Sequence, residues 1–162
     1  MIEILAVMGI IVILAGILLP ILTKVRQYSR RAVARDLCYQ VATAWKSYLQ
    51  DNRKFPALNL KEMNQQAIDI LGTTGTVYNK TQMYLEFGTN ELAQGGMLDP
   101  WGGRIQMALD NGMSWGDAAP YDGKVRVGSY GNVYDSVAVW SKGEKNGLGG
   151  TADDESDDVH GW

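Results

Sequence analysis

The sequence predicts an α+β fold in which one long N-terminal helix packs on a small antiparallel sheet. Three observations support this fold class. An uncharged apolar run covers residues 4–22, an amphipathic pattern with helical spacing continues to about residue 50, and the later chain contains short alternating apolar segments. Most of the 19 glycines follow residue 71 and supply the turns that such a sheet needs.

The apolar run is long enough to cross a membrane. Its 19 residues would form a helix of about 28 Å, close to the thickness of a bilayer's hydrocarbon core. A cleavable signal peptide is the competing interpretation, but such a segment ends in a small-residue cleavage site, whereas here the helical pattern continues. We therefore expect residues 1–22 to form a transmembrane helix.

Residues 23–54 are expected to form the amphipathic half of the same helix. From Val25 onward, apolar side chains recur three and four residues apart, while lysines and arginines occupy the other faces. Pro20 removes one backbone donor, which predicts a kink between Gly16 and Pro20 that does not end the helix. The helix is expected to stop within residues 52–56, because the residue before a proline avoids helical geometry.

Residues 55–162 are expected to form a small globular domain with an antiparallel sheet and an acidic C-terminal loop. A short helix is predicted within residues 58–71. The strand candidates are residues 104–108, 124–128 and 136–140. In the last two, every second residue is apolar or aromatic, which predicts that one face of each strand lies on a core against the long helix.

Charge and composition argue against several classes of function. The net charge of −3 is unevenly distributed along the chain. Residues 1–54 contain eight Lys/Arg and three Asp/Glu, whereas residues 55–162 contain seven Lys/Arg and fifteen Asp/Glu. No nucleic-acid motif accompanies the basic part. His160 is the only histidine, which argues against a multi-histidine zinc site and a His-based triad, so we expect no enzyme. Cys38, the only cysteine, is expected to be buried, with an intermolecular disulfide as the alternative.

Two further features have a local explanation and a functional one. Asp99 precedes a proline in an expected turn, where local hydrogen bonding is its expected role. The five tryptophans, Trp101, Trp115 and Trp140 among them, could form a sugar-binding platform, but core and turn packing is the more common use.

Four segments of the chain resemble motifs of one protein family. They are "IEILAVMGIIVILAGILLP", "DNRKFP", "LDPWGGRIQM" and "VWSKGEKNGLGGTADDESDDVHGW". The first is similar to the N-terminal helix of the type IV pilin superfamily: an early Glu, an unbroken apolar run and a Pro 17 residues later. The others resemble the helix exit, the Asp-Pro-Trp-Gly segment and the calcium loop of the major pseudopilins of type II secretion.

The chain differs from the family pattern at two places. In the family, Phe-Thr and a short basic leader precede the residues that match Met1 to Glu3, so we expect the printed sequence to start within the mature protein. The resemblance implies that this leader lies in the cytoplasm and is cut off. It also implies methylation of the protein. In the acidic loop, Asn146 stands where the family commonly has Asp, one residue later than usual after Gly143.

Glu3 is the one carboxylate beside the apolar run, and it has two interpretations. A carboxylate at a helix start interacts favourably with the free backbone donors and the positive end of the helix dipole. A carboxylate in lipid is otherwise costly and indicates function. The resemblance implies that Glu3 pairs with the α-amine of a neighbouring subunit during filament assembly. It also implies that residues 1–22 form the filament core, with Gly16 and Pro20 shaping the packing.

The acidic loop offers oxygen ligands of the kind that calcium prefers. The resemblance implies a Ca²⁺ site, whose expected ligands are Asn146, the Leu148 carbonyl, Thr151, Asp153 and Asp154. The alternative is a solvated, disordered acidic tail, which is typical of such a composition.

The function implied by the resemblance is structural. The chain is expected to be a homo-oligomeric subunit that leaves inner-membrane lipid and joins a helical filament, the type II secretion pseudopilus, with assembly machinery and minor pseudopilins as partners and no nucleic acid. The C-terminal domain would be periplasmic in a bacterium, or extracellular in a surface pilus. The alternatives are a surface type IV pilus or DNA-uptake pilin, and a membrane-tethered binding module that does not polymerise.

Overall fold

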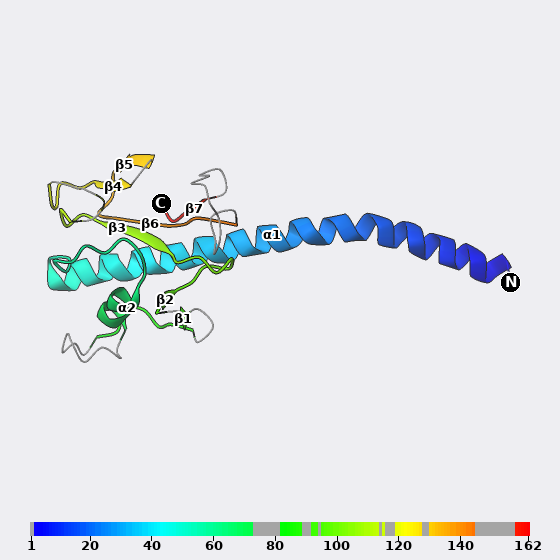
Figure 1. The fold of residues 1–162 in the computed structure, drawn as a ribbon, viewed down its shortest axis with the longest axis horizontal. Helices are drawn as coiled ribbons and strands as arrows, with labels where there is room; N and C mark the ends of the chain where they lie inside the picture. Colours follow the sequence, from blue (N-terminus) through cyan, green and yellow to red (C-terminus); the bar gives the residue numbers. More distant parts are fainter. Residues whose placement is uncertain are drawn as a thin grey trace.

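The computed structural model describes residues 2–72, 82–88, 92–93, 95–113, 115, 119–127, 130–144 and 158–162. It confirms the predicted α+β fold: a long N-terminal helix packs along a small antiparallel sheet and extends far beyond it (Figure 1). The N-terminus therefore lies at the far end of the helix, and the C-terminus lies within the small domain.

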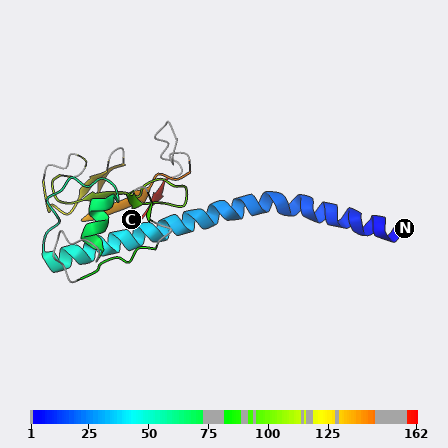
Figure 2. The ribbon, with the colours of Figure 1, turned by 60° about the horizontal axis from the view of Figure 1, so that its bottom comes forward.

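Helix α1 (Ile2–Asn52) is a single helix of 51 residues, as the spacing of apolar residues predicts. Figures 1 and 2 both show it bending in its blue N-terminal half. The helix remains unbroken through Pro20, because a proline removes only one of its hydrogen bonds. It ends where Arg53 adopts a left-handed conformation (φ 60°) and donates its backbone N–H to Leu49 O at 2.8 Å.

The predicted short helix is confirmed, but only for its second half. Helix α2 (Gln65–Leu71) begins after Asn64, whose side chain accepts a hydrogen bond from the Ala67 N–H at 3.1 Å. The preceding residues are extended instead, because Met63 N donates to Ile105 O and Met107 N donates to Lys61 O. This backbone pairing holds the segment against the sheet.

The central sheet has three antiparallel strands in the order β3-β6-β7. They are β3 (Gln106–Leu109), β6 (Val137–Ser141) and β7 (Val159–His160). Two short hairpins flank it: β1 (Leu92–Ala93) with β2 (Gly96–Met97), and β4 (Val125–Val127) with β5 (Gly131–Val133). The three predicted strands are thus present as β3, β4 and β6, each within two residues of its expected bounds.

The prediction that only one face of β6 lies on a core is wrong, because this strand is buried on both faces. Val137 and Val139 belong to the larger core beneath α1, whereas Ala138 and Trp140 pack with β4 and Trp115 in a second cluster. The β4–β5 hairpin thus forms a third layer over the sheet (Figure 1). The prediction holds for β4, where Arg126 is exposed between two buried valines.

Only the C-terminal part of α1 packs on the domain. Its buried side chains recur at helical spacing, as predicted: Ala34, Leu37, Cys38, Val41, Ala42, Ala44, Trp45 and Tyr48. The predicted stripe was expected to start at Val25, but Val25 and Tyr28 are exposed by 55% and 71%. The burial of α1 against the domain therefore starts at Ala34, about two and a half turns later than the apolar pattern indicates.

Candidate functional site

The N-terminal half of α1 exposes apolar side chains on all its faces. The large apolar residues between Ile4 and Leu22 retain 48–77% of their accessible surface, and none of this segment is buried in the protein. A continuous apolar surface of this size indicates contact with a membrane or another protein. By length and composition, this segment is long and apolar enough to cross a membrane.

Glu3 lies in the first turn of α1 with an exposed side chain. Within the part of the chain that the structure describes, its carboxylate has no hydrogen bond and no ion pair. The backbone donors and dipole of the first turn are favourable for a negative charge at this position. Both interpretations of Glu3 therefore remain compatible with its position, and any side-chain partner must come from outside the described residues.

Gly9 and Gly16 have no packing role against the residues that the structure describes. A Cβ atom built at either position meets no atom within 4 Å. Glycine inside a helix costs about 1 kcal/mol relative to alanine, so an intrachain explanation for these two residues is missing. Small residues on membrane helices allow another helix to approach closely. Both glycines thus leave room for another helix to approach.

The predicted calcium ligands cannot be placed. Asn146, Leu148, Thr151, Asp153 and Asp154 all lie outside the described residues. Among the residues that are described, no group of three or more His, Cys, Asp and Glu side chains is arranged to hold a metal ion.

The chain is fixed at the start of the acidic loop by a buried aspartate. Asp99, buried as part of a turn, accepts hydrogen bonds from the N–H groups of Trp101 and Gly103 at 2.9 and 2.8 Å. The local hydrogen bonding predicted for Asp99 is thus confirmed. Its second oxygen accepts the Ser141 hydroxyl at 2.6 Å, and that hydroxyl accepts the N–H of Gly143 at 3.1 Å. Ser141 was not predicted, because 42 residues separate it from Asp99.

The chain is also fixed beyond the acidic loop. The Tyr130 hydroxyl donates to Asp158, and β7 pairs with β6. Cys38 is buried as predicted, and its thiol contacts Val159 O at 3.8 Å. Burial, followed by the negative charge of Asp99, raises the pKa of the Cys38 thiol to about 12. Cys38 is therefore a packing residue whose thiol stays in its neutral form.

The aromatic residues at the C-terminal edge pack against one another. Trp140 is buried, contacts Trp115 and Trp162, and sits in the second core cluster. The indole of Trp115 donates to Met107 O at 2.9 Å. For Trp115 and Trp140, packing is thus the observed role.

Comparison with known proteins found no similar protein. The chain matches no protein-family model, no curated protein and no solved structure.

Proposed function

We propose that this protein is a structural subunit that polymerises into a helical, pilus-like filament, the pseudopilus of type II secretion. One observation carries the proposal: the N-terminal half of α1 is apolar and exposed all round, yet continuous with a half that is packed in the domain. Such a rod suits two dry environments in turn, the membrane before assembly and a bundle of identical helices afterwards.

Glu3 and the two glycines support this proposal over a simple anchor. A carboxylate that enters an apolar bundle needs a partner, and the α-amine of a neighbouring subunit would supply the opposite charge. Among the described residues, the space where a Cβ atom would lie is open at Gly9 and Gly16, and this space would let neighbouring helices approach. In this proposal the domain lies in the periplasm of a bacterium, and the assembly machinery and minor pseudopilins are further partners.

Replacing Glu3 by alanine tests the assembly role. We expect Glu3→Ala to abolish filaments when the assembly machinery is co-expressed, while the domain keeps its thermal stability. Asp51→Ala is the matched control, because Asp51 is an exposed carboxylate on the same helix outside the apolar half. Electron microscopy of sheared material measures the filaments. Normal filament abundance from Glu3→Ala would contradict the role of Glu3.

The same experiment separates the alternatives. Long surface filaments at natural expression levels would favour a type IV pilus or a DNA-uptake pilus over a pseudopilus. A wild-type chain that stays monomeric in the membrane, with all assembly components supplied, would favour a tethered binding module.

We also propose that the acidic loop binds Ca²⁺. Carboxylate, amide and hydroxyl oxygens suit this ion, and the loop is anchored at Ser141 and at Asp158. A cation would then join two fixed ends and stabilise the attachment of β7. Millimolar Ca²⁺ should raise the thermal unfolding temperature, because a ligand that binds only the folded state stabilises it. Asp153→Asn should remove that shift, and Mg²⁺ serves as the control ion. An unchanged unfolding temperature would contradict the site.

A further inference from the structure

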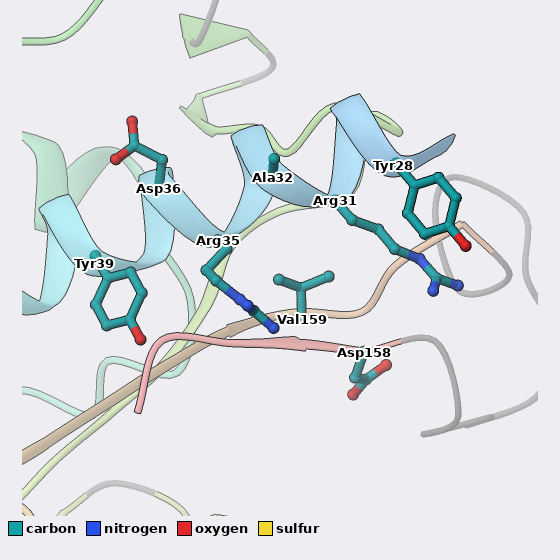
Figure 3. A pocket seen from close by; sticks show the side chains of 8 residues that line it. All are labelled: Tyr28, Arg31, Ala32, Arg35, Asp36, Tyr39, Asp158 and Val159. Carbon is teal, nitrogen blue, oxygen red and sulfur yellow. The ribbon is translucent and has the colours of Figure 1, made fainter. Parts of the chain in front are cut away.

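A pocket of about 520 Å³ lies between α1 and β7, and we call it the α1–β7 pocket. Figure 3 shows the side chains that line it: Tyr28, Arg31, Ala32, Arg35, Asp36, Tyr39, Asp158 and Val159. Two arginines and two tyrosines from α1 form one wall, and the start of β7 forms the other. None of the proposed calcium ligands and none of the filament-core residues belongs to it.

The pocket contains two positive charges that the described chain does not neutralise. Arg31 and Arg35 are exposed and one helical turn apart, and neither has a hydrogen bond or ion pair with any residue that the structure describes. Like charges at this spacing slightly destabilise a helix. Both guanidinium groups extend from α1 towards β7 (Figure 3). The arrangement therefore favours an anionic group from outside the described residues.

The two carboxylates of the pocket are engaged elsewhere. Asp36 points away from both guanidinium groups in Figure 3, and its carboxylate accepts the Gln40 amide at 2.8 Å. Asp158 accepts the hydroxyl of Tyr130. The negative charge of Asp158 repels any anion that enters the pocket, and this repulsion grows with the charge of the anion. A small multivalent anion is therefore disfavoured more strongly than singly charged carboxylates that are spread over a larger surface.

The composition of the pocket favours a protein partner. Tyr28 and Tyr39 keep 71% and 50% of their surface exposed beside the two arginines. Tyrosine and arginine are enriched at the energetic centres of protein interfaces, where they combine large contact areas with hydrogen bonding. Ala32 and Val159 add a small apolar floor between them. An acidic segment of a protein would satisfy both the charges and the rings.

The position of the pocket favours a second copy of this chain as the partner. Tyr28 follows the apolar run by six residues, so the pocket continues along α1 the surface that the proposed function places between subunits. The complementary charge is present in the same sequence, since residues 55–162 carry fifteen acidic against seven basic residues. We propose that, in the filament, the α1–β7 pocket binds an acidic surface from residues 55–162 of another subunit. This inference rests on the proposed function.

Charge neutralisation with a matched control tests the pocket. The double variant R31Q/R35Q should lower filament yield about tenfold at moderate salt, because complementary charges orient and stabilise an interface. The control R26Q/R30Q removes the same charge from the other side of the same helix, and it should leave the yield within twofold. Thermal unfolding of both variants should match the unmodified protein, since all four arginines are exposed. Equal yields from the two double variants would overturn the pocket's role.

Photo-crosslinking identifies the partner. Replacing Tyr39 by p-benzoylphenylalanine in the full chain should give dimers whose second peptide comes from an acidic part of residues 55–162. The same probe in the Glu3→Ala chain, which is expected not to assemble, should give no dimers. Crosslinks to lipid, within one chain or to residues 1–54 of another copy would overturn the inference while filaments still form. An unmodified chain that forms no filaments would instead overturn the proposed function, and this interface with it.

Discussion

The two halves of α1 differ in what covers their apolar side chains. Towards the C-terminus, Val41 and Trp45 are fully buried against the sheet. Towards the N-terminus, residues such as Leu14 are more than half exposed, although the helix is continuous between the two halves. Burying one large apolar side chain is worth about 1.5–3 kcal/mol, so burial in lipid or against other chains would stabilise the exposed half. One half thus belongs to the fold and the other to an environment outside it.

The largest expected effect on folding is the difference between two alanine substitutions, one in each half of α1. Trp45→Ala should lower the free energy of unfolding by about 3–5 kcal/mol, because it leaves a cavity in the core. Leu14→Ala, the matched substitution in the exposed half, should change it by less than about 0.5 kcal/mol. Chemical unfolding of the full-length protein in mild detergent, followed by near-ultraviolet circular dichroism, measures both. A comparable loss from the two variants would show that the halves are not independent.

A smaller effect is expected where the end of the chain meets the packed half. Gly161 lies so close to α1 that an added Cβ would be 2.9 Å from the Cβ of Cys38 and 3.1 Å from Val139 O. Gly161→Ala should therefore cost about 1–3 kcal/mol through overpacking and separate β7 from the helix. Faster hydrogen exchange of the Gly161 N–H, which donates to Val139 O, would report the separation.

Gly16→Ala is the control for that prediction. A Cβ at Gly16 meets no atom of the described residues within 4 Å, so the domain should keep its stability. An unchanged unfolding free energy for Gly161→Ala would mean that β7 adjusts to the added methyl group.

The sequence predicts the parts of this fold that depend on local periodicity. The length of α1 follows from apolar spacing and from Pro56, and the buried valines of β4 follow from alternation. The double burial of β6 does not, because a pattern of period two cannot indicate a third layer formed by a distant hairpin. Likewise, the exposure of Val25 depends on where the domain ends along the helix, and no local pattern encodes that limit.

The candidate site shows the same division between local and distant information. The apolar run, Glu3 and the two glycines are adjacent in sequence, so their placement on one exposed helix could be predicted. The hydrogen bond between Asp99 and Ser141 joins residues 42 positions apart, and the α1–β7 pocket joins Arg31 with Asp158. Such pairs depend on the sheet topology, which the order of predicted strands does not determine.

The smallest expected effect comes from an ion pair that ties the packed half of α1 to the turn after β5. Lys46 Nζ lies 2.6 Å from Asp135 Oδ2, and both side chains are partly exposed. Lys46→Met should cost about 0.2–1 kcal/mol, and high salt should reduce that difference, because exposed pairs are weak and screened. Partial burial alone would raise the pKa of Asp135, but the hydrogen bond and charge of Lys46, with the Ser136 and Val137 N–H groups, lower it overall.

The pH dependence of this pair has a definite sign. Because the pKa of Asp135 is lower in the folded state, its contribution to stability is complete above the ordinary aspartate pKa of about 3.9 and is lost as pH falls through the lowered folded value. The stability difference between the wild type and Lys46→Met should therefore be constant near neutral pH and narrow only below about pH 4. A difference that narrows between pH 5 and 8 would mean that another group titrates in this contact, and the link between α1 and the β5–β6 turn would need a different explanation.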